Sequence, residues 1–331
     1  PDRFIINSNM FNKVRTQTFP FAVSSAFIVI FVLLGCGRIF TDAGDLSEGL
    51  EISTVSETPS STLQNLMPEY AEVQMAFSVS DLVVGNNRIA FGLIDKELGP
   101  VIDSQVQIST FFLTERTQEG PLQIVSATYR AWPMGSGGVY TAQVKFDRPG
   151  TWGLAAKVED GNGNVSESSA RVEVKNESLV PAVGSLAPRS VTKTIQKGRE
   201  IQEITTDPSP DRELYKVSIV DALTTGMPLV VSFSTPAYCT TATCGPQLDV
   251  IKRLKDQYSE RIQFIHVEIY DNPQEIEGDL RRGRLSEVIK EWGLPSEPWT
   301  FVIDRKGIVS ARFEGFTTYV ELIESLEIML D

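Results

Sequence analysis

The chain has 331 residues, of which 41% are apolar and 22% are charged, as expected for a globular protein of about two domains. Asp and Glu outnumber Lys and Arg by 43 to 30, so the formal charge is −13 and nucleic acid is not expected as a partner. The single histidine, His266, argues against a histidine-rich metal centre. The sequence contains no nucleotide, haem or zinc motif, so we expect no cofactor and no bound metal.

The N-terminal segment predicts export from the cytoplasm. Lys13 and Arg15 precede an apolar run over residues 26–34, which ends in Leu-Leu-Gly-Cys36. This ending resembles the bacterial lipobox, so residues 1–36 are expected to be a signal peptide with Cys36 as the lipidated residue. An uncleaved signal anchor is the alternative. Both place the protein on the extracytoplasmic face of a bacterial cell envelope, attached to the membrane, where the two remaining cysteines can form a disulfide.

The middle of the chain predicts a linker followed by an all-β domain. Residues 37–70 are rich in Ser, Thr and acidic residues and predict a flexible linker. Residues 71–176 alternate short apolar runs with turn residues. The expected strands are 73–79, 88–94, 106–114, 123–131, 138–145, 152–158 and 170–174. Seven strands at this spacing predict an immunoglobulin-like β-sandwich. The segment 138–153 also resembles the YtkA/FixH-type modules of bacterial envelope proteins. Trp132 and Trp152 are expected in its core or rim.

The C-terminal part predicts an α/β domain over residues 213–331, after a proline-containing connector at 177–212. The expected strands are 217–220, 229–233, 262–269, 299–303 and 308–313, and the expected helices are 246–258, 285–292 and 320–330. The fully apolar run 229–233 is typical of a central strand that is buried on both faces. The chain is thus predicted to be multidomain, with a β-sandwich followed by an α/β fold.

Three motifs in this part resemble the extracytoplasmic thioredoxin-like proteins of the TlpA/ResA type. They are the lead-in 183–189 (VGSLAPR), the strand and loop 228–239 (PLVVSFSTPAYC) and the segment 292–307 (WGLPSEPWTFVIDRKG). The resemblance implies a thioredoxin-like fold and thiol–disulfide exchange on protein cysteines. It also implies a cis bond before Pro298, which would face the cysteines, and it places Glu297, Pro298 and Trp299 in the substrate-binding groove.

The cysteine pair departs from the Cys-x-x-Cys motif of that family. Four residues separate Cys239 from Cys244, and Gly245-Pro246 follows the second cysteine instead of lying between the two. Pro246 suits a first helical turn, so Cys244 is expected at a helix N-terminus, where backbone N–H groups favour the thiolate. We expect both cysteines to be catalytic, and the spacing leaves open which of them is the nucleophile.

His266 and Glu297 are the candidates for proton transfer or for tuning the thiols. Ser232 stands where thioredoxins carry a buried aspartate, so the usual proton acceptor is missing. His266, on the expected strand 262–269, could replace it, or it could be an ordinary strand residue. A buried carboxylate at Glu297 would raise the pKa of a nearby thiol.

Three alternatives to an exchange enzyme remain. The first is a non-catalytic assembly or binding module of the envelope, with a purely structural disulfide. The second is a peroxiredoxin, because the segment 235–245 resembles the bacterioferritin-comigratory type; Thr235 is then one residue out of place, and Pro298 stands at the position of the peroxide-binding arginine. The third is a Sco-type copper chaperone, in which two thiolates bind Cu(I). The sequence favours a membrane-anchored thiol–disulfide oxidoreductase and does not fix the direction of its reaction.

Overall fold

The computed structural model describes residues 73–133, 137–239 and 243–330. The predicted signal peptide, the lipidation site Cys36 and the linker 37–70 lie outside the described residues. Within the described part of the chain, no helix is long and apolar enough to cross a membrane.

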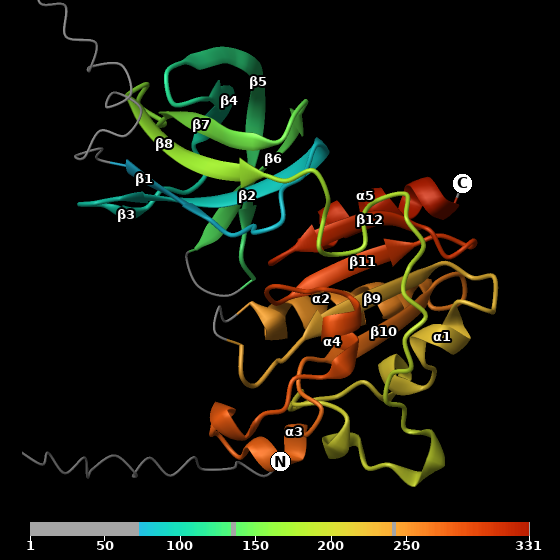
Figure 1. Ribbon diagram of the computed structural model, residues 1–331. Helices are drawn as coiled ribbons and strands as arrows, with labels where there is room; N and C mark the ends of the chain where they lie inside the picture. The colour runs from blue at the N-terminus through green and yellow to red at the C-terminus, as the bar shows by residue number, and fades with distance from the viewer. Residues whose placement is uncertain (1–72, 134–136, 240–242, 331) are drawn as a thin grey trace, which may run out of the picture. The chain divides into compact units, whose positions relative to one another are not determined.

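The first domain is built from antiparallel strands (Figure 1). They are β1 (Val73–Phe77), β2 (Gly85–Asp95), β3 (Gly99–Pro100), β4 (Gln105–Leu113), β5 (Gln118–Ala131), β6 (Gly138–Phe146), β7 (Gly150–Glu159) and β8 (Val165–Val174). Each of the seven strands expected from the sequence overlaps one of these, and the two-residue strand β3 was not expected. The domain is therefore sheet-rich and sandwich-like, as the alternating pattern predicts.

The strands form one continuous hydrogen-bonded path, β1-β2-β6-β5-β4-β7-β8, with β3 paired to β2. The 14-residue strand β5 makes this possible, because residues 118–127 pair with β4 and residues 128–131 pair with β6. The ladders thus fall into two sets that share β5, one with β1, β2, β3 and β6 and the other with β4, β7 and β8. The immunoglobulin-like assignment therefore stays a prediction.

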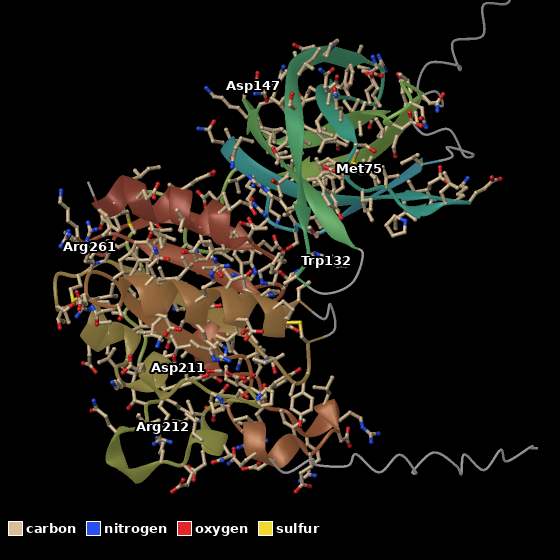
Figure 2. All side chains as sticks on the ribbon, turned by 180° about the vertical axis from the view of Figure 1, so that it is seen from behind. Met75, Trp132, Asp147, Asp211, Arg212 and Arg261 are labelled. Carbon is tan, nitrogen blue, oxygen red and sulfur yellow. A yellow bond between two sulfur atoms is a disulfide. The ribbon has the colours of Figure 1, made fainter. Side chains whose placement is uncertain are left out.

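Aromatic residues fill the core of this domain. Trp152 is buried, and its indole Nε1 donates a hydrogen bond of 3.1 Å to the carbonyl of Arg148. Phe146 meets the Trp152 ring edge-on, with centroids 4.9 Å apart. Trp132, just beyond the end of β5, is 37% exposed (Figure 2). The two tryptophans thus take the core and rim positions expected from the sequence.

The second domain has a four-stranded sheet in the order β10-β9-β11-β12. The strands are β9 (Leu229–Ser234), β10 (Gln263–Glu268), β11 (Trp299–Ile303) and β12 (Val309–Glu314), and the helices are α1 (Ile219–Ala222), α2 (Cys244–Tyr258), α3 (Pro273–Ile276), α4 (Glu287–Glu291) and α5 (Tyr319–Leu330). Short 3-10 turns cover 196–198, 201–203, 212–215 and 280–282. β9 runs parallel to β10 and antiparallel to β11, which in turn runs antiparallel to β12. This order is the thioredoxin-like arrangement that the sequence predicts (Figure 1).

Helices pack on both faces of this sheet because successive side chains of its strands point to opposite sides. Val230 packs in a core with residues of α2 and α5. Its neighbour Val231 packs in a second core with residues of α1 and α4. The prediction of a strand at 217–220 is wrong, since this segment leads into the short helix α1. Ile219 and Ala222 are both fully buried, and their spacing of three places them on one helical face.

The connector 177–212 packs against the second domain. Val180 and Ala187 are buried in one of its cores, and Ile201 and Ile204 are buried in the other. Backbone hydrogen bonds also join the connector to β12, from Gly184 N–H to the Val309 carbonyl at 2.8 Å. These contacts give the connector a fixed path over the thioredoxin-like fold.

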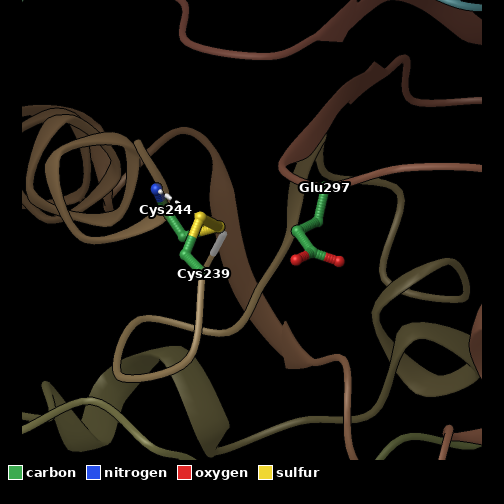
Figure 3. Close-up of side chains that lie close together, drawn as sticks. All are labelled: Cys239, Cys244 and Glu297. Carbon is green, nitrogen blue, oxygen red and sulfur yellow. Dashed lines mark hydrogen bonds between the residues drawn. A yellow bond between two sulfur atoms is a disulfide. The ribbon is translucent and has the colours of Figure 1, made fainter. Parts of the chain in front are cut away.

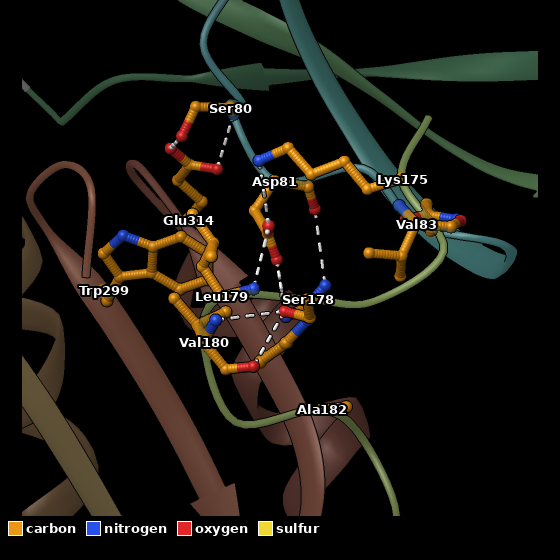
Figure 4. Close-up of polar contacts among 12 residues, drawn as sticks. Ser80, Asp81, Val83, Lys175, Ser178, Leu179, Val180, Ala182, Trp299 and Glu314 are labelled. Carbon is orange, nitrogen blue, oxygen red and sulfur yellow. Dashed lines mark hydrogen bonds and ion pairs between the residues drawn. The ribbon is translucent and has the colours of Figure 1, made fainter. Parts of the chain in front are cut away.

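Polar contacts join the β1–β2 segment of the first domain to β12 of the second (Figure 4). The backbone N–H and the hydroxyl of Ser80 donate hydrogen bonds of 2.7 and 2.6 Å to the Glu314 carboxylate. Asp81, whose side chain is completely buried, pairs with Arg312 at 2.9 Å and accepts a hydrogen bond from Ser178. A buried carboxylate with an arginine and a hydroxyl as partners is well compensated, so these contacts favour a defined interface.

Candidate active site

The two cysteines lie in the segment that connects the central strand β9 to the long helix α2. β9 is buried along its whole length, and the loop after it carries Cys239. Helix α2 begins at Cys244, with Pro246 in its first turn. A disulfide bond joins Cys239 to Cys244, with their Cα atoms 5.8 Å apart (Figure 3). The predicted helix begins at 246, and the structure begins it two residues earlier, at the second cysteine itself.

The two sulfur positions differ in their surroundings. Cys244 is 0% exposed, whereas Cys239 is partly exposed. The backbone N–H of Cys244 donates a hydrogen bond to the Cys239 sulfur at 3.3 Å. This N–H belongs to the first turn of a 15-residue helix, where backbone donors have no partner within the helix and the helix dipole is positive. Negative charge on the Cys239 sulfur is therefore stabilised at this place.

Glu297 faces the disulfide from the segment that precedes β11. Its carboxylate and the two sulfurs all lie within 4.8 Å of one another (Figure 3). The carboxylate is half-buried, and this burial raises the pKa of Glu297 above its usual value. No described residue donates a hydrogen bond to it or forms an ion pair with it. The structure thus brings three of the residues singled out in the sequence to one point.

Pro298 and Trp299 lie next to this group but are buried. The Glu297–Pro298 peptide bond is cis, as the family resemblance implied. The Pro298 carbonyl accepts a hydrogen bond of 2.8 Å from the Gly315 N–H. Trp299 is 2% exposed, and its indole donates to the Ser296 hydroxyl at 3.0 Å. The Trp299 side chain is thus a core residue of β11, and its place in a substrate-binding groove stays a prediction.

His266 also lies in the core and is not part of the group formed by the sulfurs and Glu297. Its Nδ1 lies 2.8 Å from the Tyr215 hydroxyl, and its Nε2 lies 2.9 Å from the Ser234 hydroxyl. Burial lowers the pKa of His266 to about 4, so the ring is neutral at pH 7. A neutral ring with both nitrogens in hydrogen bonds is typical of a packing role. Proton transfer by His266 stays a prediction from sequence alone.

Glu268 is a buried carboxyl group that the sequence analysis missed. It ends β10 and accepts hydrogen bonds of 2.8 Å from both the N–H and the hydroxyl of Thr206. Burial raises the pKa of Glu268 to about 7. The same Thr206 hydroxyl accepts a hydrogen bond of 3.3 Å from the Ala237 N–H, two residues before Cys239. Glu268 therefore supports the cysteine loop through Thr206. An acidic residue near the end of the expected strand 262–269, whose other polar residues are Gln263 and His266, was the signal for it.

Comparisons with known proteins find fold neighbours only. No family model matches the chain, and no curated protein matches it. Among solved structures, a thiol:disulfide interchange protein DsbE from Chlorobium tepidum is 15% identical, with a TM-score of 0.33, over 46% of this chain and 99% of its own. StoA from Bacillus subtilis is 21% identical, with a TM-score of 0.29, over 44% and 99%. A superoxide reductase from Thermotoga maritima is 13% identical, with a TM-score of 0.19, over 31% and 86%. At these low TM-scores, the fold assignment rests on the strand order of the chain itself.

Proposed function

We propose that the chain is a thiol–disulfide oxidoreductase that acts on protein cysteines through Cys239 and Cys244. The observation that carries the proposal is the disulfide at the start of α2, with Cys239 partly exposed and Cys244 buried. A partly exposed cysteine whose sulfur accepts a helix N–H hydrogen bond has the properties of an attacking thiolate. A buried sulfur within bonding distance has the properties of a resolving thiol.

In the reductive direction, the Cys239 thiolate attacks one sulfur of a substrate disulfide. A mixed disulfide forms, and the other substrate sulfur leaves as a thiolate that takes up a proton. The Cys244 thiol loses its proton and attacks the Cys239 sulfur, which releases the second substrate thiolate. One substrate disulfide becomes two thiols, and the dithiol of the protein becomes the Cys239–Cys244 disulfide. The oxidative direction is the same sequence of steps in reverse.

Glu297 is the residue beside the sulfurs that a substrate chain can reach, because it is half-buried while Pro298 is buried. No described residue hydrogen-bonds the backbone of Glu297. We propose that this backbone pairs with an extended substrate segment and that Pro298 shapes the floor of the groove. The Glu297 carboxylate is placed to accept the thiol proton.

We propose further that the protein works on the extracytoplasmic face of a bacterial envelope, anchored through Cys36 or an uncleaved signal anchor. The support for this is the sequence pattern of residues 1–36 and the use of a disulfide. The peroxidase alternative has less support, because Thr235 is fully buried and lies beside Thr206, with its hydroxyl 3.4 Å from that of Thr206.

Trapping of mixed disulfides tests the function and the roles of the two cysteines together. The Cys244→Ser variant should form a stable mixed disulfide with a protein substrate that contains a disulfide. Cys239 can attack that disulfide, but the second thiol of the pair, which would resolve the product, is absent. The Cys239→Ser variant should trap little, since Cys244, the other cysteine of the pair, is buried. Trapping by Cys239→Ser alone would reverse the assignment, and equal trapping by both variants would contradict distinct roles for the two cysteines. No trapping by either would sink the proposed function.

A further inference from the structure

The group formed by Cys239, Cys244 and Glu297 has the composition of a metal site once the disulfide is reduced. It offers two thiolates and one carboxylate, and these ligand atoms already lie within 4.8 Å of one another (Figure 3). Zn²⁺ binds sulfur at about 2.3 Å and carboxylate oxygen at about 2.0–2.2 Å. Two ligands on one ion can therefore be no more than about 4.6 Å apart, so small side-chain rotations bring all three onto a common centre.

This site departs from the sequence-based expectation of no bound metal, because its third ligand is distant in the sequence, but the spacing of the cysteines fits metal binding. Structural zinc sites take paired cysteines separated by about two to four residues, and here four residues separate them. A tetrahedral zinc ion holds two sulfurs about 3.8 Å apart at that bond length. The Cα atoms are 5.8 Å apart, so opening the sulfur–sulfur bond leaves both side chains directed at the same space.

Glu297 supplies the second and independent reason. Its carboxylate is half-buried, and within residues 73–133, 137–239 and 243–330 it has no hydrogen-bond donor and no cation as a partner. Burying a carboxylate without compensation is unfavourable, and a bound cation removes this penalty. The N–H of Cys244, which points at the Cys239 sulfur, would fix the orientation of one thiolate as an outer-shell donor.

We infer that the reduced form binds one Zn²⁺ through the thiolates of Cys239 and Cys244 and the carboxylate of Glu297, with a fourth position open to water. Both sulfurs bind the ion as thiolates, so any proton still carried by Cys239 or Cys244 is released to the solvent when the ion binds. The ion occupies both thiolates, so it blocks their attack on a disulfide and protects the dithiol from oxidation. The inference shares its sulfurs with the proposed function, but metal binding does not require that exchange takes place. Cu(I) can be bound by the two thiolates alone, without the carboxylate. A contribution of Glu297 to binding therefore distinguishes a Zn²⁺ site from a Cu(I) site.

Metal titration of the purified, reduced chain under anaerobic conditions tests the inference. Co²⁺, used as a spectroscopic probe, should bind one ion per chain, with thiolate-to-metal charge-transfer bands and the visible bands of a tetrahedral site. Zn²⁺ should displace it, and competition with a chromophoric chelator gives the affinity. Glu297→Gln should weaken Zn²⁺ binding by at least about tenfold. The exposed Glu327→Gln serves as the matched control and should leave the affinity unchanged.

Absence of the charge-transfer bands would overturn the inference, and so would equal Zn²⁺ affinity of Glu297→Gln and the wild type. Disulfide exchange measured in the presence of a chelator separates this result from the proposed function. Exchange that persists without any metal binding sinks only the zinc site. Zinc binding without exchange sinks only the oxidoreductase. A circular dichroism spectrum and a cooperative thermal transition that match those of the wild type show that the Glu297→Gln variant is folded.

Discussion

Replacement of Glu297 by Gln is expected to make the nucleophilic thiol ionise at a lower pH. The Glu297 carboxylate lies within 4.8 Å of both sulfurs, and nothing else among the described residues neutralises it. An ionised carboxylate at this distance disfavours a thiolate, because like charges repel. Gln keeps the size and polarity of the side chain and removes only the charge.

The size of the effect follows from the distance. Two unit charges 4.8 Å apart interact by about 0.9 kcal/mol at the dielectric constant of water and by about 3.5 kcal/mol at an effective dielectric constant of about 20. These energies correspond to shifts of about 0.6 and about 2.5 pH units in the midpoint of ionisation of the Cys239 thiol. Glu297 is only half-buried, so solvent screening favours the lower part of this range. We expect the midpoint to move down by about one pH unit.

The assay is the rate of alkylation of the reduced protein by iodoacetamide as a function of pH, in a chelator and with Cys244→Ser as the background. The rate follows the fraction of Cys239 present as thiolate. Glu297→Gln should shift the profile to lower pH, whereas the exposed Glu260→Gln should leave it unchanged. An unchanged or upward-shifted profile for Glu297→Gln would refute the argument that this carboxylate acts electrostatically on the nucleophile.

Other predictions concern the buried charges and the backbone. Burial lowers the pKa of His266 to about 4 and raises that of Glu268 to about 7. The unfolded chain binds the His266 proton more tightly, so this residue costs up to about 3 kcal/mol of stability as the pH falls from about 6.5 to 4; Glu268 costs a similar amount as the pH rises from about 4.5 to 7. In urea unfolding between about pH 4 and pH 7, the His266→Gln variant retains only the effect of Glu268 and should therefore lose stability as the pH rises. The Glu268→Gln variant retains only the effect of His266 and should lose stability as the pH falls. Identical pH profiles of the two variants would contradict both pKa shifts. Arg88 pairs with Glu321 at 3.0 Å, with both side chains 7% exposed, so Arg88→Ala should cost about 3 kcal/mol or more in the same assay. Adding Glu321→Gln should restore part of the loss, and a fully additive double variant would argue against a buried pair. Gly293 has φ of +61°, and a Cβ there would lie 2.1 Å from a connector carbonyl, so Gly293→Ala should lower the stability by at least about 1 kcal/mol, whereas an unchanged melting temperature would contradict the close approach.

Much of the fold could be predicted because burial follows the sequence period. In β4 the buried residues Val106 and Ile108 alternate with exposed polar residues, so the strand is evident from the pattern. β9 could be recognised as a central strand from its unbroken apolar run. The segment 217–220 could not be assigned correctly, because a short apolar run has the same composition in a buried helix turn and in a strand.

The candidate site was predictable only in part. The proximity of Cys239, Cys244 and Glu297 could be expected from the spacing of their motifs, because these motifs resemble those of a fold in which the corresponding loops lie close together. The burial of His266 and Trp299 could not be predicted in this way. β10 and β11 are covered on both faces, so the sequence has no alternation of apolar and polar residues that would show which way a side chain points. The role of Glu268 depends on Thr206, 62 residues away in the connector, and sequence gives no information on such a contact.

The reduction potential of the Cys239–Cys244 disulfide in the purified chain tests the central claim most directly. It is measured by equilibration with dithiothreitol and glutathione buffers, with rapid acid quenching and alkylation to count free thiols. We predict reversible opening at a potential above about −300 mV, the range of exchange-active disulfides, with Cys239 alkylated before the buried Cys244. A bond that stays closed in these buffers while the protein remains folded would show that the disulfide is structural and would contradict the account.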